Sequence, residues 1–345
     1  MKSLPVVSVI MAAWNSEEHL KEAIDSILNQ TFQDLELIIV NDGSTDGTEK
    51  IIKSYSSGKI IYVKNIINTN VSKSRNIALS LAKGKYIAIM DSDDISCHNR
   101  LEQQVSFMEN NHDIGVCGSW AQEFDSYGSR GKLTNPLSDN GLKVLLLFSV
   151  PFINPSVIFR RKLVKDFNIS YDENYKYSED YRFWLDCSEY TKFANIPKFL
   201  LKYRYVLKGL TRTAERTNFQ NKFNVSKSIH SKVLSKLNLS LSDEEYYLHY
   251  RVGLISKIVS DYICLDEMDT YFRKLLLHNL NIAYFDQREM DKLLCRKFTI
   301  AAFHNFKNSN ITSYKFILRR WVYMFIYYKT FELFFLKKYF INNEK

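Results

Sequence analysis

The sequence predicts an α/β protein with a mostly parallel sheet and flanking helices, followed by an α-helical C-terminal region. Over residues 1–94, short apolar runs alternate with segments of helical periodicity, which is typical of successive right-handed βαβ units. From about residue 216 onward proline is absent, glycine occurs only at Gly253, and long helical patterns dominate. We therefore expect a first domain over residues 1–215 and a helical region over residues 216–345.

Short apolar runs in the first third are the expected strands of the parallel sheet. They are Val6–Met11, Leu35–Val40, Lys59–Lys64 and Tyr86–Met90. Nearly uninterrupted apolar runs indicate strands buried on both faces. Helices are expected between them, the first after a capping box formed by Asn15 and Glu18, and the others over Thr48–Tyr55 and Ser72–Ala82.

Residues 95–215 are expected to be mixed. Their periodicity predicts helices near Arg100–Asn110, Leu142–Phe148 and Tyr181–Tyr190. It predicts strands near Val116–Phe124, Ser156–Arg160 and Phe199–Tyr205.

Three polar clusters follow the expected parallel strands. They are Ala12–Asn15, Asn41–Ser44 and Asp91–Asp94. In parallel sheets ligands bind at the carboxyl ends of the strands, so these clusters are expected to share one ligand-binding edge.

The cluster Asp91-Ser92-Asp93-Asp94 carries three carboxylates within four residues. Such charges repel one another unless a cation or ordered donors offset them. Oxygen ligands suit Mg²⁺ or Mn²⁺, especially where the ion also bridges phosphates. The alternative is a solvated acidic turn that caps the helix expected after Asn99.

Five blocks, in order, resemble the family 2 glycosyltransferases of GT-A fold, of the kind that build bacterial surface polysaccharides. The blocks are residues 7–15, 28–48, 74–94, 154–161 and 178–185. The resemblance implies a GT-A domain, and it does not extend to residues 216–345.

The resemblance implies donor-binding roles around the three clusters. An aromatic side chain, here Trp14, would lie against the nucleotide base, and Asp42 would hydrogen-bond the base. The implied donor-binding residues are Ala13, Trp14, Asp42, Arg75, Asn76, Asp91 and Ser92. The alternatives are a surface aromatic for Trp14, a turn residue for Asp42, and exposed helix residues for Arg75 and Asn76.

The resemblance also implies a metal site and a catalytic carboxylate. Asp91 and Asp93 resemble the pair that holds Mn²⁺ or Mg²⁺ against the donor pyrophosphate. Asp180 would take the proton from the acceptor hydroxyl, with Glu179 in reserve. The alternative for both is favourable charge at a helix N-terminus. The segment Tyr203-Arg204 begins like another family segment whose histidine is absent here, so it receives no role.

The net charge of +9 lies in the last 54 residues. Residues 292–345 hold 11 basic and 2 acidic side chains, and residues 1–291 are balanced. Across residues 313–340 helical phase separates basic from aromatic side chains, which favours an anionic membrane surface as partner. A core-packed helix with a solvated basic face is the alternative. Nucleic acid is not expected, since a single-strand groove would interleave the aromatics with the charges.

Together with the acidic cluster, the resemblance implies an inverting, metal-dependent hexosyl- or N-acetylhexosaminyltransferase. The expected donor is a nucleotide-sugar, commonly a UDP-sugar, and the acceptor a glycan or a polyprenyl-diphosphate-linked glycan. Scattered cysteines without metal spacing favour a cytoplasmic protein, and the basic tail a peripheral position at the inner face of the cell membrane. A non-catalytic glycan- or membrane-binding relative is one alternative. The other is a sugar nucleotidyltransferase, although Met11–Ser16 lacks the glycines expected of its nucleotide loop.

Overall fold

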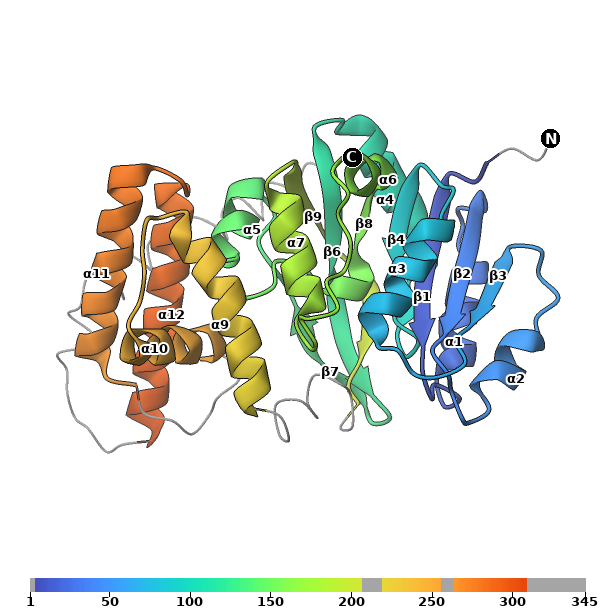
Figure 1. The fold of residues 1–345 in the computed structure, drawn as a ribbon, viewed down its shortest axis with the longest axis horizontal. Helices are drawn as coiled ribbons and strands as arrows, with labels where there is room; N and C mark the ends of the chain where they lie inside the picture. The colour runs from blue at the N-terminus through green and yellow to red at the C-terminus, as the bar shows by residue number, and fades with distance from the viewer. Residues whose placement is uncertain (1–3, 207–218, 256–262, 309–345) are drawn as a thin grey trace. The chain divides into compact units, whose positions relative to one another are not determined.

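The computed structural model describes residues 4–206, 219–255 and 263–308 (Figure 1). The chain divides into two compact units, Met1–Lys143 with Val150–Val225, and Val144–Ser149 with Ser226–Lys345. The predicted domain boundary at residue 215 lies outside the described residues.

Within the described residues, nine strands form one sheet in the first unit. In chain order they are β1 (Val7–Ala13), β2 (Leu35–Asn41), β3 (Ile60–Lys64), β4 (Tyr86–Ile89), β5 (Ile95–Ser96), β6 (Ile114–Asp125), β7 (Gly128–Leu133), β8 (Ile158–Arg160) and β9 (Lys192–Arg204). Their order across the sheet is β3-β2-β1-β4-β8-β6-β9-β5, and β7 pairs with β6.

Strand β1 lies between β2 and β4, and both pairs are parallel. The register places Ala13 opposite Asn41 and Ile10 opposite Ile89. The carboxyl ends of these three strands therefore lie at one edge of the sheet, as the sequence predicted.

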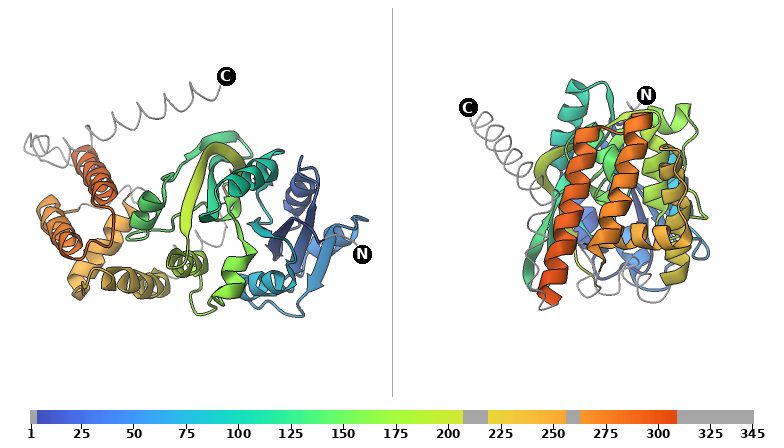
Figure 2. Two further views of the ribbon diagram at one scale, coloured as in Figure 1. Left: turned by 90° about the horizontal axis from the view of Figure 1, so that it is seen from above. Right: turned by 90° about the vertical axis from the view of Figure 1, so that its left-hand side faces the viewer.

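Helices cover both faces of this sheet (Figure 2). Their bounds are α1 (Leu20–Leu28), α2 (Thr48–Lys53), α3 (Val71–Leu81), α4 (Arg100–Asn110), α5 (Asp139–Leu145), α6 (Arg161–Asp166) and α7 (Glu179–Ser188), with a 3₁₀ turn, η1 (Asn154–Ser156), before β8. Helices α1 and α4 bury their apolar side chains in the same core cluster as β1, β2 and β4. Helix α3 contacts β1 and β2, and Figure 2 shows it on the other face.

The side chain of Arg100 at the start of α4 is fully buried. Its Nη2 donates to the carbonyl of Ile89 on β4 at 2.9 Å and to that of Val157, just before β8, at 3.3 Å. Its Nε donates to Gln104 Oε1 at 3.0 Å. The Arg100 guanidinium therefore donates its hydrogen bonds to uncharged acceptors. These bonds hold α4 against the place where β4 and β8 meet.

Beyond β4 the sheet is mixed, because β6 pairs with β9 in parallel and β5 pairs with β9 antiparallel. Strand β8 is antiparallel to both β4 and β6, and β7 forms an antiparallel hairpin with β6 that was not predicted. Gly128, at φ +124°, begins β7 beside the two-residue turn.

The predicted capping box of Asn15 and Glu18 is wrong. Helix α1 begins at Leu20, after His19. Asn15 adopts φ 47°, and its Oδ1 accepts a hydrogen bond from the backbone N–H of Thr45 at 2.9 Å. Its side chain therefore joins two loops instead of capping a helix.

The second unit is helical, which confirms that part of the fold prediction. Its helices are α9 (Phe219–Ser235, which begins in the first unit), α10 (Asp243–Leu254), α11 (Leu265–Ile282) and α12 (Gln287–Asn308). A capping box of Ser242 and Glu245 starts α10. Among the described residues, no helix combines the length and hydropathy needed to cross a membrane. Residues 309–345, most of the predicted basic tail, lie outside the described residues.

Candidate functional site

Hydrogen bonds join the three loops at the carboxyl edge of β1, β2 and β4. The backbone N–H of Asp42 donates to Ala13 O at 2.8 Å. The backbone N–H of Asn15 donates to Ser44 Oγ at 3.0 Å. The hydroxyls of Ser16 and Ser92 lie 2.8 Å apart. The three polar clusters of the sequence thus form one connected surface.

The acidic loop Asp91–Asp94 concentrates negative charge at this surface. Burial, and next the charge of Asp91, raise the pKa of Asp93 to about 6. Burial, and next the charge of Asp93, raise the pKa of Asp94 well above its ordinary value. Among the described residues, no donor reaches Asp94 Oδ2. Ionisation of all three carboxylates therefore needs more positive charge than the described residues around the loop supply.

A divalent cation held by Asp91 and Asp93 would supply such positive charge. Within the described residues, no group of three or more His, Cys, Asp or Glu side chains could hold a metal ion alone. An ion on the acidic loop would thus take its other ligands from water and from phosphate oxygens, as Mg²⁺ does at nucleotide sites.

Arg75 on α3 links the acidic loop to the start of α7. Its Nη2 donates to Asp91 Oδ1 at 2.9 Å, and its Nη1 donates to Glu179 Oε1 at 3.0 Å. Only 8% of its side chain is exposed. Burial opposes its charge, but Asp91, Tyr171 and the other nearby acids raise the pKa of Arg75 above its ordinary value. The structure therefore brings together three of the predicted site residues.

Glu179 and Asp180 differ in their partners. Burial, and next the charge of Asp180, raise the pKa of Glu179 to about 7, although Arg75 opposes that rise. Burial also raises the pKa of Asp180. Asp180 Oδ1 accepts from the backbone N–H of Tyr181 at 2.7 Å, and within the described residues Asp180 forms no salt bridge. Of the two carboxylates, Glu179 is the one that pairs with Arg75, and the assignment of Asp180 as the base stays a prediction.

Asp42 is buried and already accepts four hydrogen bonds. Its Oδ1 accepts from Asn65 Nδ2 at 2.7 Å and from the N–H and hydroxyl of Thr69 at 3.0 and 2.8 Å; its Oδ2 accepts from the N–H of Asn70 at 3.0 Å. Burial opposes ionisation, but these hydrogen bonds lower the pKa of Asp42. Because a carboxylate offers about four lone-pair sites, Asp42 here shapes the turn over residues 65–70. Its contact with a base stays a prediction.

Asn76 uses its side-chain amide on the backbone of Tyr171. Its Nδ2 donates to Tyr171 O, and the N–H of Tyr171 donates to Asn76 Oδ1, both at 2.8 Å. The guanidinium of Arg75 lies 5.4 Å from the centroid of the Tyr171 ring. Asn76 therefore supports the Arg75 site indirectly, and a donor contact from Asn76 stays a prediction.

Trp14 lies at the rim of the same edge, with 47% of its surface exposed, whereas Ala13 is buried at the end of β1. An exposed indole beside polar loops offers a stacking face for a flat ligand. Its contact with a base stays a prediction.

Two residues at this site, Tyr171 and Arg204, are not among those that the sequence predicted. Tyr171 packs beside Arg75, and Arg204, at the end of β9, donates from Nε to Asp93 O at 2.7 Å. The Tyr-Arg pair at 203–204 was the available signal for Arg204. Tyr171 carried none, because its contacts join positions 95 residues apart.

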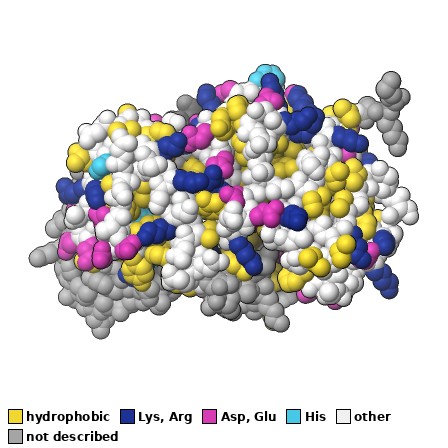
Figure 3. Space-filling view, viewed as in Figure 1, with side chains coloured by type: hydrophobic (Ala, Val, Ile, Leu, Met, Phe, Trp, Pro, Cys, Tyr) yellow, Lys and Arg dark blue, Asp and Glu magenta, His cyan; other side chains and the backbone are white. Residues whose placement is uncertain are grey.

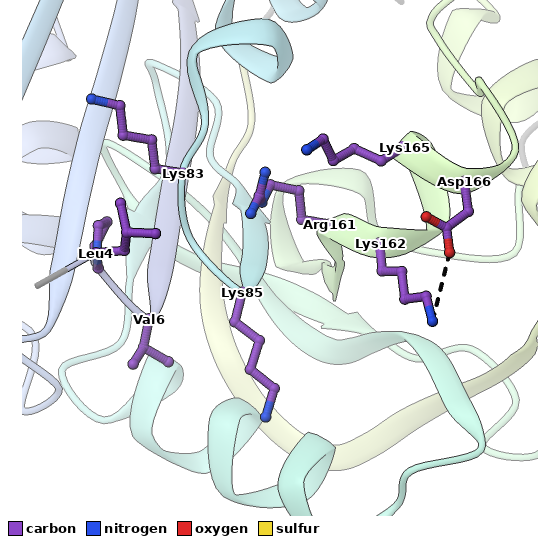
Figure 4. Close-up of a pocket in the computed structure, with 9 residues that line it drawn as sticks. Leu4, Val6, Lys83, Lys85, Arg161, Lys162, Lys165 and Asp166 are labelled. Atoms are coloured by element: carbon purple, nitrogen blue, oxygen red, sulfur yellow. Dashed lines mark ion pairs between the residues drawn. The ribbon is translucent and has the colours of Figure 1, made fainter.

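A pocket of about 510 Å³ lies at the opposite edge of the sheet, beside the start of β1 and β4 (Figure 4). Its lining residues are Leu4, Pro5, Val6, Lys83, Lys85, Arg161, Lys162, Lys165 and Asp166. It contains no predicted site residue. The wider surface in Figure 3 intersperses basic and acidic side chains, in agreement with the balanced charge of residues 1–291.

Comparison with known proteins identifies related sequences and folds. The family model for glycosyl transferase family 2 matches residues 8–171. An uncharacterized glycosyltransferase of Methanocaldococcus jannaschii is 42% identical over 208 residues, which cover 58% of this chain and 71% of that protein. An Escherichia coli enzyme named UDP-Glc:alpha-D-GlcNAc-diphosphoundecaprenol beta-1,3-glucosyltransferase is 31% identical over 183 residues, or 48% of this chain and 72% of that enzyme.

Among solved structures, S. aureus TarS 1–349 in complex with UDP-GlcNAc has the same fold. It superposes with a TM-score of 0.58 at 20% identity and covers 88% of both chains.

Proposed function

Because this chain belongs to glycosyltransferase family 2, we propose that it moves a sugar from a UDP-sugar to a lipid-linked glycan, with inversion at the anomeric carbon and with a divalent cation. Glycosyltransferase activity follows from the family itself. The donor, the cation, the stereochemistry and the acceptor are the proposal.

The observation that carries the proposal is the double ion pair of Arg75. It joins Asp91 of the acidic loop, where a donor diphosphate and its cation would lie, to Glu179 beside the candidate base Asp180. Transfer with inversion needs a carboxylate base on one side of the sugar and charge neutralisation on the other. Arg75 holds the elements that carry these two groups.

In this mechanism Asp180 accepts the proton of the acceptor hydroxyl as its oxygen attacks the anomeric carbon. Glu179 is ion-paired with Arg75, so we assign the proton transfer to Asp180. Trp14 would stack on the base at the rim. When bound to Asp91 and Asp93, Mn²⁺ or Mg²⁺ would offset the charge of the departing nucleoside diphosphate.

The donor and acceptor are proposed from relatives. The printed name of the E. coli relative specifies UDP-Glc as donor and a GlcNAc-diphosphoundecaprenol acceptor. A lipid-linked acceptor supports action at the inner face of the cell membrane. The basic tail over residues 292–345 would favour that location, because cationic segments are attracted to anionic lipids.

The test is a panel of nucleotide-sugars offered with a GlcNAc-diphosphate-lipid acceptor, with Mn²⁺, with Mg²⁺ and with EDTA. UDP-Glc is expected to give a β-linked product only with metal. Asp180→Asn should lower kcat by about 10²–10⁴-fold, the usual value of general base catalysis. Asp186→Asn is the matched control, since Asp186 lies on the same helix and pairs with Arg182.

A product of retained configuration would overturn the inverting mechanism. Full activity in EDTA would overturn the metal assignment.

A further inference from the structure

Arg204 makes four contacts around the acidic loop. Its Nε donates to Asp93 O at 2.7 Å, and its backbone N–H donates to Asp94 Oδ1 at 2.7 Å. Its Nη2 forms an ion pair with Glu22 on α1, and its guanidinium carbon lies 4.5 Å from the centroid of the Phe124 ring on β6. Only 11% of its side chain is exposed. The guanidinium is therefore fixed by three separate elements.

These contacts extend the pairing of β5 with β9. The ladder pairs Ile95 with Lys202 and Ser96 with Leu201. Arg204 follows two positions after Lys202, at the level where the acidic loop leaves the sheet. Asp94 Oδ1 takes the place of a backbone acceptor there. The loop thus stays attached to β9 beyond the last paired residue.

The side chain of Arg204 binds the backbone of Asp93 and not its carboxylate. Within the described residues, neither Asp93 nor Asp94 has a salt bridge, and Arg75 pairs only with Asp91 in this loop. The guanidinium on the carbonyl constrains the backbone at Asp93 and forms no ion pair with its carboxylate. Arg204 can thus orient a metal-binding residue without competing with the metal ion for its carboxylate.

We propose that Arg204 is a positioning residue that holds Asp93 in the orientation needed to bind a divalent cation. The inference rests on the proposed function in one respect, the assignment of Asp93 as a ligand. Glu22 acts indirectly, because its carboxylate holds Nη2 of the Arg204 guanidinium.

The test measures Mn²⁺ affinity directly, by electron paramagnetic resonance of free Mn²⁺ with the full chain, with and without UDP. Arg204→Ala should weaken Mn²⁺ binding by about 10–100-fold, the usual effect of removing a group that orients a ligand. Arg204→Lys should recover part of the loss, since one ammonium cannot reach Asp93 O and Glu22 in the same geometry. Glu22→Gln should weaken binding in the same direction by less.

Arg130→Ala is the matched control. Arg130 is also an ion-paired arginine stacked on an aromatic ring, with Asp125 and Tyr205 as partners, and it does not touch the loop. The Mn²⁺ affinity of the Arg130→Ala protein should equal that of the wild type. Thermal unfolding of every variant separates orientation from folding, and if Arg204→Ala does not fold, Glu22→Gln decides.

Mn²⁺ affinity within twofold of the wild type in Arg204→Ala and Glu22→Gln would overturn the inference and leave the proposed function intact. An equal loss in Arg130→Ala would overturn it too, because general surface charge would then explain the result. Absence of Mn²⁺ binding by the wild-type chain would overturn both the inference and the proposed metal site.

Discussion

Arg75 Nη1 lies 3.0 Å from Glu179 Oε1, a contact that joins α3 to α7 across 104 positions of the sequence. The other arm of the same guanidinium reaches Asp91. A single cation therefore holds two acidic segments that would otherwise repel each other. Its removal should affect ligand binding, proton transfer and stability together.

Replacing Arg75 with alanine is expected to leave Glu179 buried and unpaired. Removing one partner of a buried ion pair costs about 3–5 kcal/mol of unfolding free energy. We expect a loss of that order in urea unfolding, and a fall in kcat/KM because Asp91 and the base lose their common support. Lys73→Ala, an exposed position on the same helix, should change neither. Unchanged stability and activity in Arg75→Ala would contradict the assigned role of the double ion pair.

The pH dependence of activity should reflect the raised pKa of Asp180. A base must be ionised to accept a proton, so activity is expected to fall as pH decreases through that pKa. Burial raises the pKa of Asp180. The acid limb of kcat/KM should therefore lie above pH 4, since an ordinary aspartate has a pKa of about 3.9. The measurement is a pH–rate profile with donor saturation checked at each pH. Asp186→Asn should keep the same limb, and a wild-type limb at ordinary carboxylate pH would argue against Asp180 as base.

Lys297 of α12 should give the second unit a pH-dependent stability. Its Nζ donates to Val252 O at 2.9 Å, and burial, with a smaller contribution from Arg296, lowers the pKa of Lys297 to about 7. An unfolded lysine keeps its proton to about pH 10.4. Between these values the unfolded state binds more protons, so the contribution of Lys297 to stability rises with pH.

Lys297→Met should remove that rise. Urea unfolding between pH 7 and 9.5 should show a slope smaller than in the wild type by up to about 1.4 kcal/mol per pH unit, the value for one proton. Lys274→Met, on the neighbouring helix α11, should keep the wild-type slope, since Lys274 is partly exposed and pairs with Glu245. Equal slopes in all three proteins would contradict a lowered pKa for Lys297.

Gly43 should not tolerate a side chain. It adopts φ +69°, and a Cβ at this position would lie 2.4 Å from the carbonyl carbon of Ile67. Gly43→Ala is expected to lose about 1–3 kcal/mol of unfolding free energy from backbone strain, plus a steric term. Gly131→Ala meets nothing within 4 Å and serves as control in the same urea titration. A Gly43→Ala protein as stable as that control would show that the loop rearranges freely.

Local patterns predicted the parts of the fold that depend on neighbours in sequence. The apolar runs gave β1, β2, β3 and β4 within two residues at each end, and helical periodicity gave α4 at its observed bounds. The acidic loop could be found because its charges are contiguous. By contrast, β7 lies in a glycine-containing hairpin with little apolar alternation, so no periodic signal marked it.

Contacts between distant segments could not be predicted from one sequence. Arg75 contacts Glu179, and Arg204 contacts the carbonyl of Asp93. Both contacts depend on the order in which the strands pair in the sheet. The same limit explains Asn15. Its spacing to Glu18 is that of a helix cap, yet the loop after β2 approaches closely, and Asn15 accepts a hydrogen bond from Thr45 there. Which side chain a polar residue meets is decided by tertiary packing.

The buried guanidinium of Arg100 also links the position of α4 to the pairing of β4 with β8. It donates to the carbonyls of Ile89 and Val157, which belong to segments 68 positions apart and lie together because β4 pairs with β8, and to Gln104 Oε1 on its own helix. Without that pairing the guanidinium would lose the Val157 acceptor, and a buried charged donor that lacks an acceptor is costly. Disruption of the antiparallel strand is therefore expected to weaken the attachment of α4 to the parallel half of the sheet as well.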